Sequence, residues 1–286
     1  MNPEPALARV AVLIVNYNAG PWLARAVASL CEPDAVEPEI IVVDNGSRDD
    51  SLERLQATSL TIDRAGRNLG FAAGINRAAR QTTRELLLLL NPDCRITPAD
   101  LARLVDELDR HPEAALVSGR VVGEDGREQR ASRRRLPTPS SIIGEILPFS
   151  ANGVDLTDRP APAESIEVEA VSGACMLVRR ARFDALGGLD EGYPMHFEDL
   201  DLFARLQAAG DRLRWVPEVS IVHAGGISSS HRRAGTEIDK HRGLWRYLQR
   251  HCRPQWPFWQ RPLWALALLG HLGLRLLRAA LPGRHG

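Results

Sequence analysis

Two aspartates stand directly after short apolar runs of the chain, at positions where carboxylates often meet a ligand. Asp44 ends the run Ile40–Val43, and Asp93 lies in the turn that follows the run Leu86–Leu90. Carboxylate oxygens are the ligands that Mg²⁺ and Mn²⁺ prefer, and these cations usually share their coordination shell with substrate phosphates. Aspartate is also frequent in turns for backbone reasons alone. Asp93 is therefore a metal candidate whose assignment depends on its surroundings.

A second acidic group stands at the predicted start of a helix that ends near Ala209. It consists of Glu198, Asp199 and Asp201. Acidic residues in a first helical turn complement the helix dipole and are common without any catalytic role. The preceding residues, Met195–Phe197, form a partly apolar wall, which raises a carboxyl pKa toward the range that suits a general base. These carboxylates are therefore candidates for proton transfer.

The elements that must position these residues alternate between apolar runs and helical patterns. Strands are predicted over Val10–Val15, Ile40–Val43, Leu60–Asp63, Leu86–Leu90, Ala115–Val117, Ala170–Val178 and Trp215–Val222. Helices are predicted over Pro21–Leu30, behind Ser47, from about Gly70 to Arg80, from Thr97, over Ala181–Leu186 and from about Asp199 to Ala209. Apolar strands separated by helices are typical of an α/β fold with a mostly parallel sheet covered on both faces. Ligands of such sheets bind beyond the carboxyl ends of the strands, where Asp44 and Asp93 stand.

Two segments depart from this pattern. Between residues 123 and 166 the periodicity fades, in a stretch with the arginine run Arg133–Arg135 and four prolines from Pro137 to Pro160. A loop of this length is usually a functional flap or an insertion. The arginines could close over a diphosphate, although a charge run is more often solvated surface.

The second segment is the tail, residues 254–286, which begins with several tryptophans. Its longest stretch without charged residues, Pro262–Leu274, is shorter than the ~20 residues that a membrane-spanning helix needs. On a helix, His271, Arg275 and Arg278 form one polar stripe on an otherwise apolar cylinder. The helix either packs on the core or lies in a membrane interface, and we favour the interface.

Composition excludes several classes of function. Lys plus Arg and Asp plus Glu both number 36, so the net charge is zero and no overall field attracts nucleic acid. Lys240 is the only lysine, which excludes lysine chemistry elsewhere. The four cysteines are scattered and indicate neither a zinc site nor a disulfide framework. The turn Asn16–Gly20 is no dinucleotide fingerprint, and no phosphate-binding P-loop appears. The first residues do not resemble a signal peptide, so we expect a cytoplasmic protein.

Eight motifs in order resemble family 2 of the glycosyltransferases. Those of the donor half are Val12–Asn18, Val42–Ser47, Asn68–Asn76 and Leu89–Asp93, and those of the acceptor half are Ser172–Val178, Gly187–Glu191, Phe197–Asp201 and Val222–Gly226. The similarity runs from about Val10 to Ser229 and is greatest to rhamnosyltransferase-like members. It implies a GT-A fold over residues 1–253, with a donor half at 1–115 and an acceptor half at 116–253.

The resemblance implies a role for each donor-half motif. Asp44 would accept a hydrogen bond from the imide N–H of uracil or thymine; the alternative is an Asx-turn at a strand end. The other residues implied to bind the nucleotide are Asn16, Tyr17, Asn68, Gly70 and Gly74. For the last three, the alternative is a helix-starting turn with close packing.

The metal and the acceptor have their own implied residues. Asp93 matches the last carboxylate of the D-x-D metal motif, whose first position is Asn91 here, and His223 would complete the metal shell. Asp199 would be the catalytic base, because inversion needs one group to take the proton of the attacking hydroxyl. Glu198 is the second candidate base or, with Asp190 and Asp201, an acceptor ligand. Arg232 and Arg233 are the phosphate candidates.

The expected function is metal-dependent, inverting transfer of a sugar from a nucleoside diphosphate to a saccharide or lipid-linked saccharide of the bacterial surface. Thymidine diphosphate rhamnose (dTDP-rhamnose) is the favoured donor, with uridine diphosphate galactofuranose or an N-acetylhexosamine donor open. The cofactor would be Mg²⁺ or Mn²⁺, and the tail would meet the inner face of the plasma membrane. A sugar nucleotidyltransferase, or a sugar-nucleotide-binding protein without catalysis, is the alternative.

Overall fold

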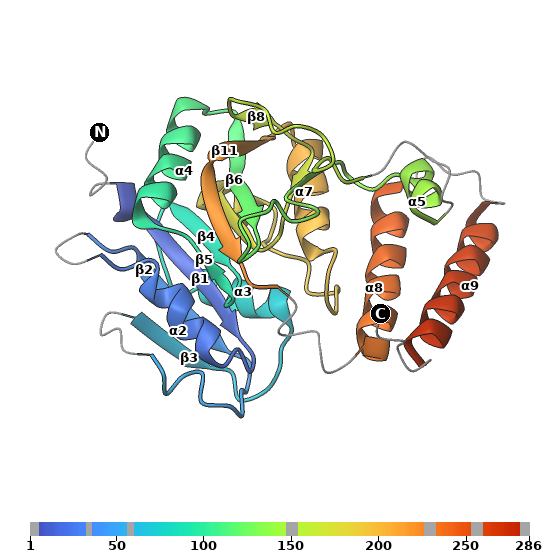
Figure 1. Cartoon of the computed structure of the whole chain (residues 1–286), viewed down its shortest axis with the longest axis horizontal. Helices are drawn as coiled ribbons and strands as arrows, with labels where there is room; N and C mark the ends of the chain where they lie inside the picture. The colour runs from blue at the N-terminus through green and yellow to red at the C-terminus, as the bar shows by residue number, and fades with distance from the viewer. Residues whose placement is uncertain are drawn as a thin grey trace.

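A mixed β-sheet runs through the centre of the protein in the computed structural model (Figure 1). The structure describes residues 6–32, 36–55, 60–146, 154–225, 233–252 and 260–280. Within them the strand order is β3-β2-β1-β4-β10-β6-β11-β5, and β8 also pairs with β11. The strands are β1 Val10–Asn16, β2 Glu39–Asp44, β3 Leu60–Arg64, β4 Leu86–Leu90, β5 Cys94–Arg95, β6 Ala114–Val122, β8 Ile166–Glu167, β10 Cys175–Arg179 and β11 Arg212–His223. A separate two-stranded sheet joins β7 Arg133–Arg134 to β9 Ala170–Val171.

The four strands β3, β2, β1 and β4 are parallel, so their carboxyl ends share one edge of the sheet. Asn16 is in register with Asp44 across β1 and β2. β10 then runs antiparallel between β4 and β6, while β11 is parallel to β6. Near its end β11 pairs with β5, which sets His223 opposite Cys94. The last strand therefore brings its histidine to the turn that carries Asp93.

Helices cover both faces of the sheet. They are α2 Pro21–Ala28, α3 Phe71–Ala79, α4 Pro98–Arg110, α5 Pro139–Ile146, α6 Arg180–Ala185, α7 Glu198–Ala208, α8 Arg233–Tyr247 with a π-helical extension over Leu248–Cys252, and α9 Gln260–Ala280. Successive strand residues point to opposite faces. Leu13 and Leu89 pack in one core with side chains of α3, α7 and α8, and Ile14 and Leu88 pack in the other with α2 and α4.

The predicted α/β class with a mostly parallel sheet and flanking helices is confirmed, and three local expectations change. The run Ala170–Val178 is two strands, β9 and β10, because the turn between them moves the chain to another sheet. Turns rather than a helix follow β2 within the described residues up to 55. α8 has no counterpart in the prediction, because its largely polar sequence shows little amphipathic pattern.

The tail helix α9 pairs with α8 at one end of the molecule, beyond α7 (Figure 1). Two residues of its polar stripe contact α8: His271 Nδ1 lies 3.0 Å from His241 Nε2, and Arg275 Nε lies 3.1 Å from Glu237 Oε2, while the side chain of Arg278 lies outside the described residues. Its outward side exposes four leucines, which are Leu263, Leu266, Leu269 and Leu274. Among the described helices, none combines the length and the apolar character that a membrane crossing requires. α9 therefore packs on the protein through His271, Arg275 and the buried Leu268, and its other side exposes the four leucines.

Candidate active site

Asn16 and Asp44 meet at the carboxyl ends of β1 and β2. Asn16 Nδ2 donates to Asp44 Oδ1 at 2.9 Å, and the backbone N–H of Ser47 donates to Asp44 Oδ2 at 3.2 Å. Asp44 is 4% exposed, and a carboxylate can accept about two hydrogen bonds at each oxygen. The Asp44 carboxylate thus accepts from the backbone three residues on, one residue further than in the Asx-turn considered as the alternative, and it can accept a further hydrogen bond. Tyr17, the next residue after Asn16, is exposed.

The Asn68–Gly74 segment closes the same edge of the sheet. Asn68 Oδ1 accepts from the N–H of Gly70 at 2.9 Å, and Gly70 has a φ of +86°, which favours glycine. A Cβ at Gly74 would lie 2.7 Å from Val15 Cγ2, so glycine here lets α3 pack closely against β1. These contacts hold a turn of backbone beside Asp44.

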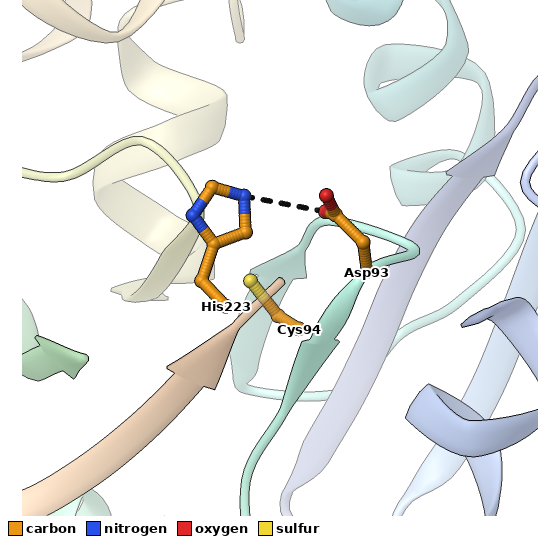
Figure 2. Close-up of side chains that lie close together, drawn as sticks. All are labelled: Asp93, Cys94 and His223. Carbon is orange, nitrogen blue, oxygen red and sulfur yellow. Dashed lines mark ion pairs between the residues drawn. The ribbon is translucent and has the colours of Figure 1, made fainter. Parts of the chain in front are cut away.

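A second cluster stands at the end of β11 and the start of β5. Figure 2 shows Asp93, Cys94 and His223 converging there, with His223 Nε2 3.3 Å from Asp93 Oδ1. Their ligand atoms all lie within 4.8 Å of one another. The two ligands that the sequence predicts for a metal, separated by 130 positions in the chain, are thus brought together.

Gln129 fixes the orientation of the His223 ring. Gln129 Nε2 donates to the backbone carbonyl of His223 at 2.7 Å, so its Oε1 faces His223 Nδ1, at 2.8 Å, as the acceptor. Nδ1 of His223 is therefore the donor, so in the neutral ring the lone pair lies on Nε2, which faces the Asp93 carboxylate. Two acceptors that face each other fit a divalent cation between them.

Cys94, the third member of this cluster, is a poorer metal ligand than Asp93 and His223. Burial raises the pKa of its thiol well above the ordinary value, so the sulfur stays protonated. A protonated thiol is a poor ligand for Mg²⁺ or Mn²⁺, which prefer oxygen. The donor set that fits a hard divalent cation is therefore Asp93 with His223.

The Gly173–Ala174 backbone lies between Asp199 and the turn that carries Asp93. The N–H of Asn91 donates to the carbonyl of Ala174 at 2.8 Å, and a Cβ at the adjoining Gly173 would lie 2.7 Å from Asp199 Oδ2. Glycine at position 173 therefore allows the Asp199 carboxylate to approach the Asn91–Asp93 turn. Asp199 Oδ2 also forms an ion pair with Arg134 Nη2 at 2.5 Å.

The backbone that presents Asp199 is strained. His196 and Phe197, just before α7, both have positive φ values, of 64° and 72°. Side chains other than glycine rarely adopt this region, and such strain costs about 1–3 kcal/mol per residue and is concentrated at functional sites. Glu198 follows directly. Its burial, with the Asp199 charge as second cause, raises the pKa of its carboxyl to about 8.

Comparison with known proteins decides the family. The sequence model described as Glycosyl transferase family 2 matches residues 11–187. The chain belongs to glycosyltransferase family 2. It is 30% identical over 289 residues to an N-acetylglucosaminyl-diphospho-decaprenol L-rhamnosyltransferase of Mycobacterium tuberculosis, with 92% of each chain covered. It is 28% identical to the rhamnosyltransferase WbbL of Escherichia coli, over 75% of this chain and 83% of that protein.

Solved structures show the fold of this glycosyltransferase. The mannosyltransferase PcManGT from Pyrobaculum calidifontis, in complex with GDP-Man and Mn²⁺, matches with a TM-score of 0.59 at 19% identity, over 97% of this chain and 76% of that one. GalNAc-T7 with UDP, GalNAc and Mn²⁺ matches with a TM-score of 0.56 at 19% identity, over 75% of this chain and 43% of that one. The predicted GT-A fold is confirmed.

Two acidic residues that the sequence predicts for the acceptor site, Asp201 and Asp190, form ion pairs within the protein. Asp201 is fully buried, and its oxygens lie 2.7 Å from Arg205 Nε and 2.8 Å from His251 Nε2. Asp190 forms ion pairs with Arg246, at 2.9 Å, and with Arg250. Both aspartates therefore join the end of α8 and its extension to α7 and to the Gly187–Glu191 segment.

The two phosphate candidates of the expected site come just before α8 in the sequence or at its first residue. Arg233 is the first residue of α8, and Arg232 falls outside the described residues. The structure also adds three residues to the glycosyltransferase site. Gly173 belongs to a motif quoted from the sequence, and Arg134 to the arginine run, but Gln129 lies in an aperiodic segment where no pattern distinguishes it.

Proposed function

We propose that the enzyme is an inverting, metal-dependent rhamnosyltransferase that transfers L-rhamnose from dTDP-rhamnose to a polyprenyl diphosphate-linked saccharide. The similarity to the mycobacterial rhamnosyltransferase, over 92% of both chains, supports the sugar and the type of acceptor. One geometric observation carries the chemistry. The Asn91–Asp93 turn and Asp199 are linked through Gly173 and Ala174, which supports placing the candidate metal ligand and the candidate base near each other.

The donor would bind along the carboxyl edge of β1 and β2. Asp44 would accept the imide N–H of thymine with its remaining lone pairs, and Tyr17 would lie beside the base. The turn of Asn68 and Gly70 would approach the ribose and diphosphate with its backbone, while Gly74 keeps α3 close to β1. In this arrangement Asn16 is a positioning residue, because its amide holds Asp44.

The transfer step needs one base and one leaving group. The acceptor hydroxyl oxygen forms a bond to the anomeric carbon of rhamnose as the bond from that carbon to the β-phosphate oxygen breaks. Its proton passes to a carboxylate oxygen of Asp199, and the nucleoside diphosphate departs with the electron pair. A divalent cation held by Asp93 and His223 would supply positive charge to the departing diphosphate. Glu198 would stay protonated beside Asp199 at neutral pH.

Asp201 and Asp190 would position the elements around the acceptor. Asp201 would hold the first turn of α7 through Arg205 and His251, and Asp190 would hold the extension of α8 near the acceptor. Arg232 and Arg233 remain candidates for contacts with phosphate.

The enzyme would work at the inner surface of the plasma membrane. The exposed leucines of α9 would enter the interface of a bilayer. A polyprenyl diphosphate-linked acceptor resides in that membrane, so surface binding brings enzyme and acceptor together.

A transfer assay tests the proposal. The purified enzyme is incubated with Mn²⁺, a farnesyl diphosphate-linked N-acetylglucosamine acceptor and one of three donors, dTDP-rhamnose, UDP-galactofuranose or UDP-N-acetylglucosamine. We expect transfer from dTDP-rhamnose with inversion. Asp199→Asn should lower kcat by at least about 100-fold, as loss of a general base does. It should keep the thermal stabilisation by dTDP and Mn²⁺.

Asp184→Asn is the matched control. Asp184 forms an exposed ion pair with Arg180 on α6, so its substitution removes the same charge away from the site. Transfer by Asp199→Asn at the rate of this control would refute the assignment of the base. Transfer from another donor alone would refute the proposed sugar.

A further inference from the structure

A cavity of about 530 Å³ lies between the start of α7, the β7 segment and the α8–α9 pair. Four fixed cations line it, namely Arg130, Arg134, Lys240 and Arg275. Apolar side chains, including Phe197, Leu200 and Leu244, make up much of the remaining wall. A cavity that combines cations with an apolar wall suits a ligand that is both anionic and hydrocarbon.

The charge of the cavity is only partly balanced within the protein. Glu237 is the one carboxylate among its lining residues, and two cations share it. Arg275 Nε lies 3.1 Å from Glu237 Oε2, whereas Lys240 Nζ lies 3.9 Å from Glu237 Oε1. A phosphate diester would bring the negative charge that this pair of cations lacks. The lining residue His196 also has an Nε2 with no hydrogen-bond partner in the described part of the chain.

The cavity reaches the candidate base. Arg134, which lines it, forms the ion pair with Asp199. Phe197 and Leu200, also in its wall, flank Asp199 in the chain. A Cβ at Gly243 would lie 3.0 Å from Phe197 Cδ2, so glycine in α8 lets this helix come close to the start of α7. The base therefore adjoins one side of the cavity, while Lys240 and Arg275 on α8 and α9 form another.

We propose that this cavity binds the diphosphate and the first isoprenoid units of the lipid-linked acceptor, with Lys240 and Arg275 as its phosphate ligands. The inference rests on the proposed function, which sets the type of acceptor. The first sugar of the acceptor would extend past Arg134 toward Asp199, and the hydrocarbon would lie against Phe197, Leu200 and Leu244. Such a substrate needs a cation for its diphosphate and an apolar surface for its lipid. α9 offers both, because it supplies Arg275 to the cavity and exposes leucines outward.

The single lysine of the chain allows a direct test. An amine-reactive reagent can label only Lys240 and the N-terminal amine, and Lys240 is 44% exposed. We expect farnesyl diphosphate, used below its micellar concentration, to slow labelling of Lys240 at least threefold while the N-terminal amine reacts at its usual rate. Inorganic pyrophosphate should protect less, and farnesol or dTDP with Mn²⁺ should not protect. Unchanged labelling with farnesyl diphosphate, or equal protection by dTDP and Mn²⁺, would overturn the assignment.

Substitutions provide the second test. Lys240→Gln and Arg275→Gln should each raise KM for the lipid-linked acceptor at least tenfold and leave KM for the donor unchanged, and the double variant should lose farnesyl diphosphate binding in calorimetry. Lys240→Arg should retain most of the affinity. The control is Arg103→Gln with Arg212→Gln, since these two arginines form exposed ion pairs with Asp100 and Glu167.

The outcomes separate the inference from the proposed function. Wild-type enzyme that binds dTDP and Mn²⁺ but not farnesyl diphosphate would contradict the inference alone. Enzyme that binds farnesyl diphosphate but transfers no sugar from any nucleotide donor would contradict the proposed function alone. Full acceptor affinity in Lys240→Gln, whose long ion pair contributes little to folding, would place the diphosphate elsewhere.

Discussion

At the scale of single residues, the neighbours of a functional side chain decide what it can do. His223 is a useful metal ligand only if its Nε2 is unprotonated, and Gln129, by accepting from Nδ1, selects the neutral tautomer whose lone pair lies on Nε2. Partners of this kind fix the orientation and the tautomer of a histidine ligand. Gln129 is therefore a positioning residue for the cation.

Gln129→Leu removes the acceptor for Nδ1 and keeps a side chain of similar length. We expect the affinity for Mn²⁺ to fall by about 10- to 100-fold, the usual cost of losing such a partner. The measurements are Mn²⁺ binding by electron paramagnetic resonance and the Mn²⁺ concentration that gives half-maximal transfer. Gln129→Glu should restore binding, since a carboxylate accepts the same proton. Gln81→Leu, which removes an exposed amide bonded to Asp63, is the control. Equal Mn²⁺ affinity in Gln129→Leu and the control would contradict this role.

Part of this site is predictable from the sequence, because residues that follow the strands of a parallel sheet lie at its carboxyl edge. Asp44 and Asp93 follow apolar runs, so their positions at the carboxyl edge follow from the parallel arrangement alone. The approach of His223 to Asp93 depends on the pairing of β11 with β5, which no local pattern specifies. The hydrogen bond from Gln129 depends on an aperiodic segment that folds back on β11. Contacts between distant segments are therefore what the sequence leaves open.

At the scale of elements, the first turn of α7 combines backbone strain with a buried carboxyl group, that of Glu198. Two left-handed residues precede the helix, and Glu198 has a buried Oε2 with no hydrogen-bond partner among the described residues. Burial raises the pKa of Glu198 from 4.5 to about 8. Between these pH values the folded enzyme keeps a proton that the unfolded chain has lost. Stability should therefore fall as the pH rises through this window.

Glu198→Gln tests this effect, because glutamine has the same shape and no proton to lose. The free energy of unfolding of the wild type should decrease between about pH 5 and about pH 9 by roughly 2–4 kcal/mol more than that of the variant, since each pKa unit corresponds to ~1.4 kcal/mol. Urea unfolding at both pH values measures the difference. Glu53→Gln, at an exposed turn, should keep the pH dependence of the wild type. Parallel pH dependences for wild type and Glu198→Gln would show that Glu198 titrates normally.

The helices and strands also differ in how well they can be predicted from the sequence. β1, β2 and β4 are apolar on both faces and are predicted within a residue or two. β10 is predicted as part of one longer strand, because the sequence pattern does not reveal that Gly173 turns the chain under Asp199. α8 is missed because its pattern is weak; its contacts with α7 and α9 are tertiary. The expected tail helix is present, and His271 and Arg275 of its polar stripe contact His241 and Glu237 of α8.

At the scale of the whole molecule, the zero net charge conceals separated regions. Acidic groups stand at the candidate metal site and at the start of α7, while cations line the cavity between α7 and the α8–α9 pair. α9 adds a third region, an outward row of leucines at the same end of the molecule as that cavity. An orientation with α9 on a membrane would turn the cavity side toward the lipid-linked acceptor, so the arrangement predicts where the enzyme meets its membrane.

The double variant Leu266→Gln/Leu269→Gln tests this orientation at the two most exposed leucines of α9. Burying a leucine in hydrocarbon is favourable by about 1.5–3 kcal/mol, so the variant should bind vesicles containing phosphatidylglycerol at least tenfold more weakly than the wild type in co-sedimentation. Its free energy of unfolding should stay within about 0.5 kcal/mol of the wild type, because exposed side chains contribute little to folding. Val36→Gln/Ile62→Gln changes two other exposed apolar residues and should leave vesicle binding unchanged. If the leucine variant sediments with vesicles as the control does, another surface holds the enzyme at the membrane and the cavity must receive its acceptor from a different direction.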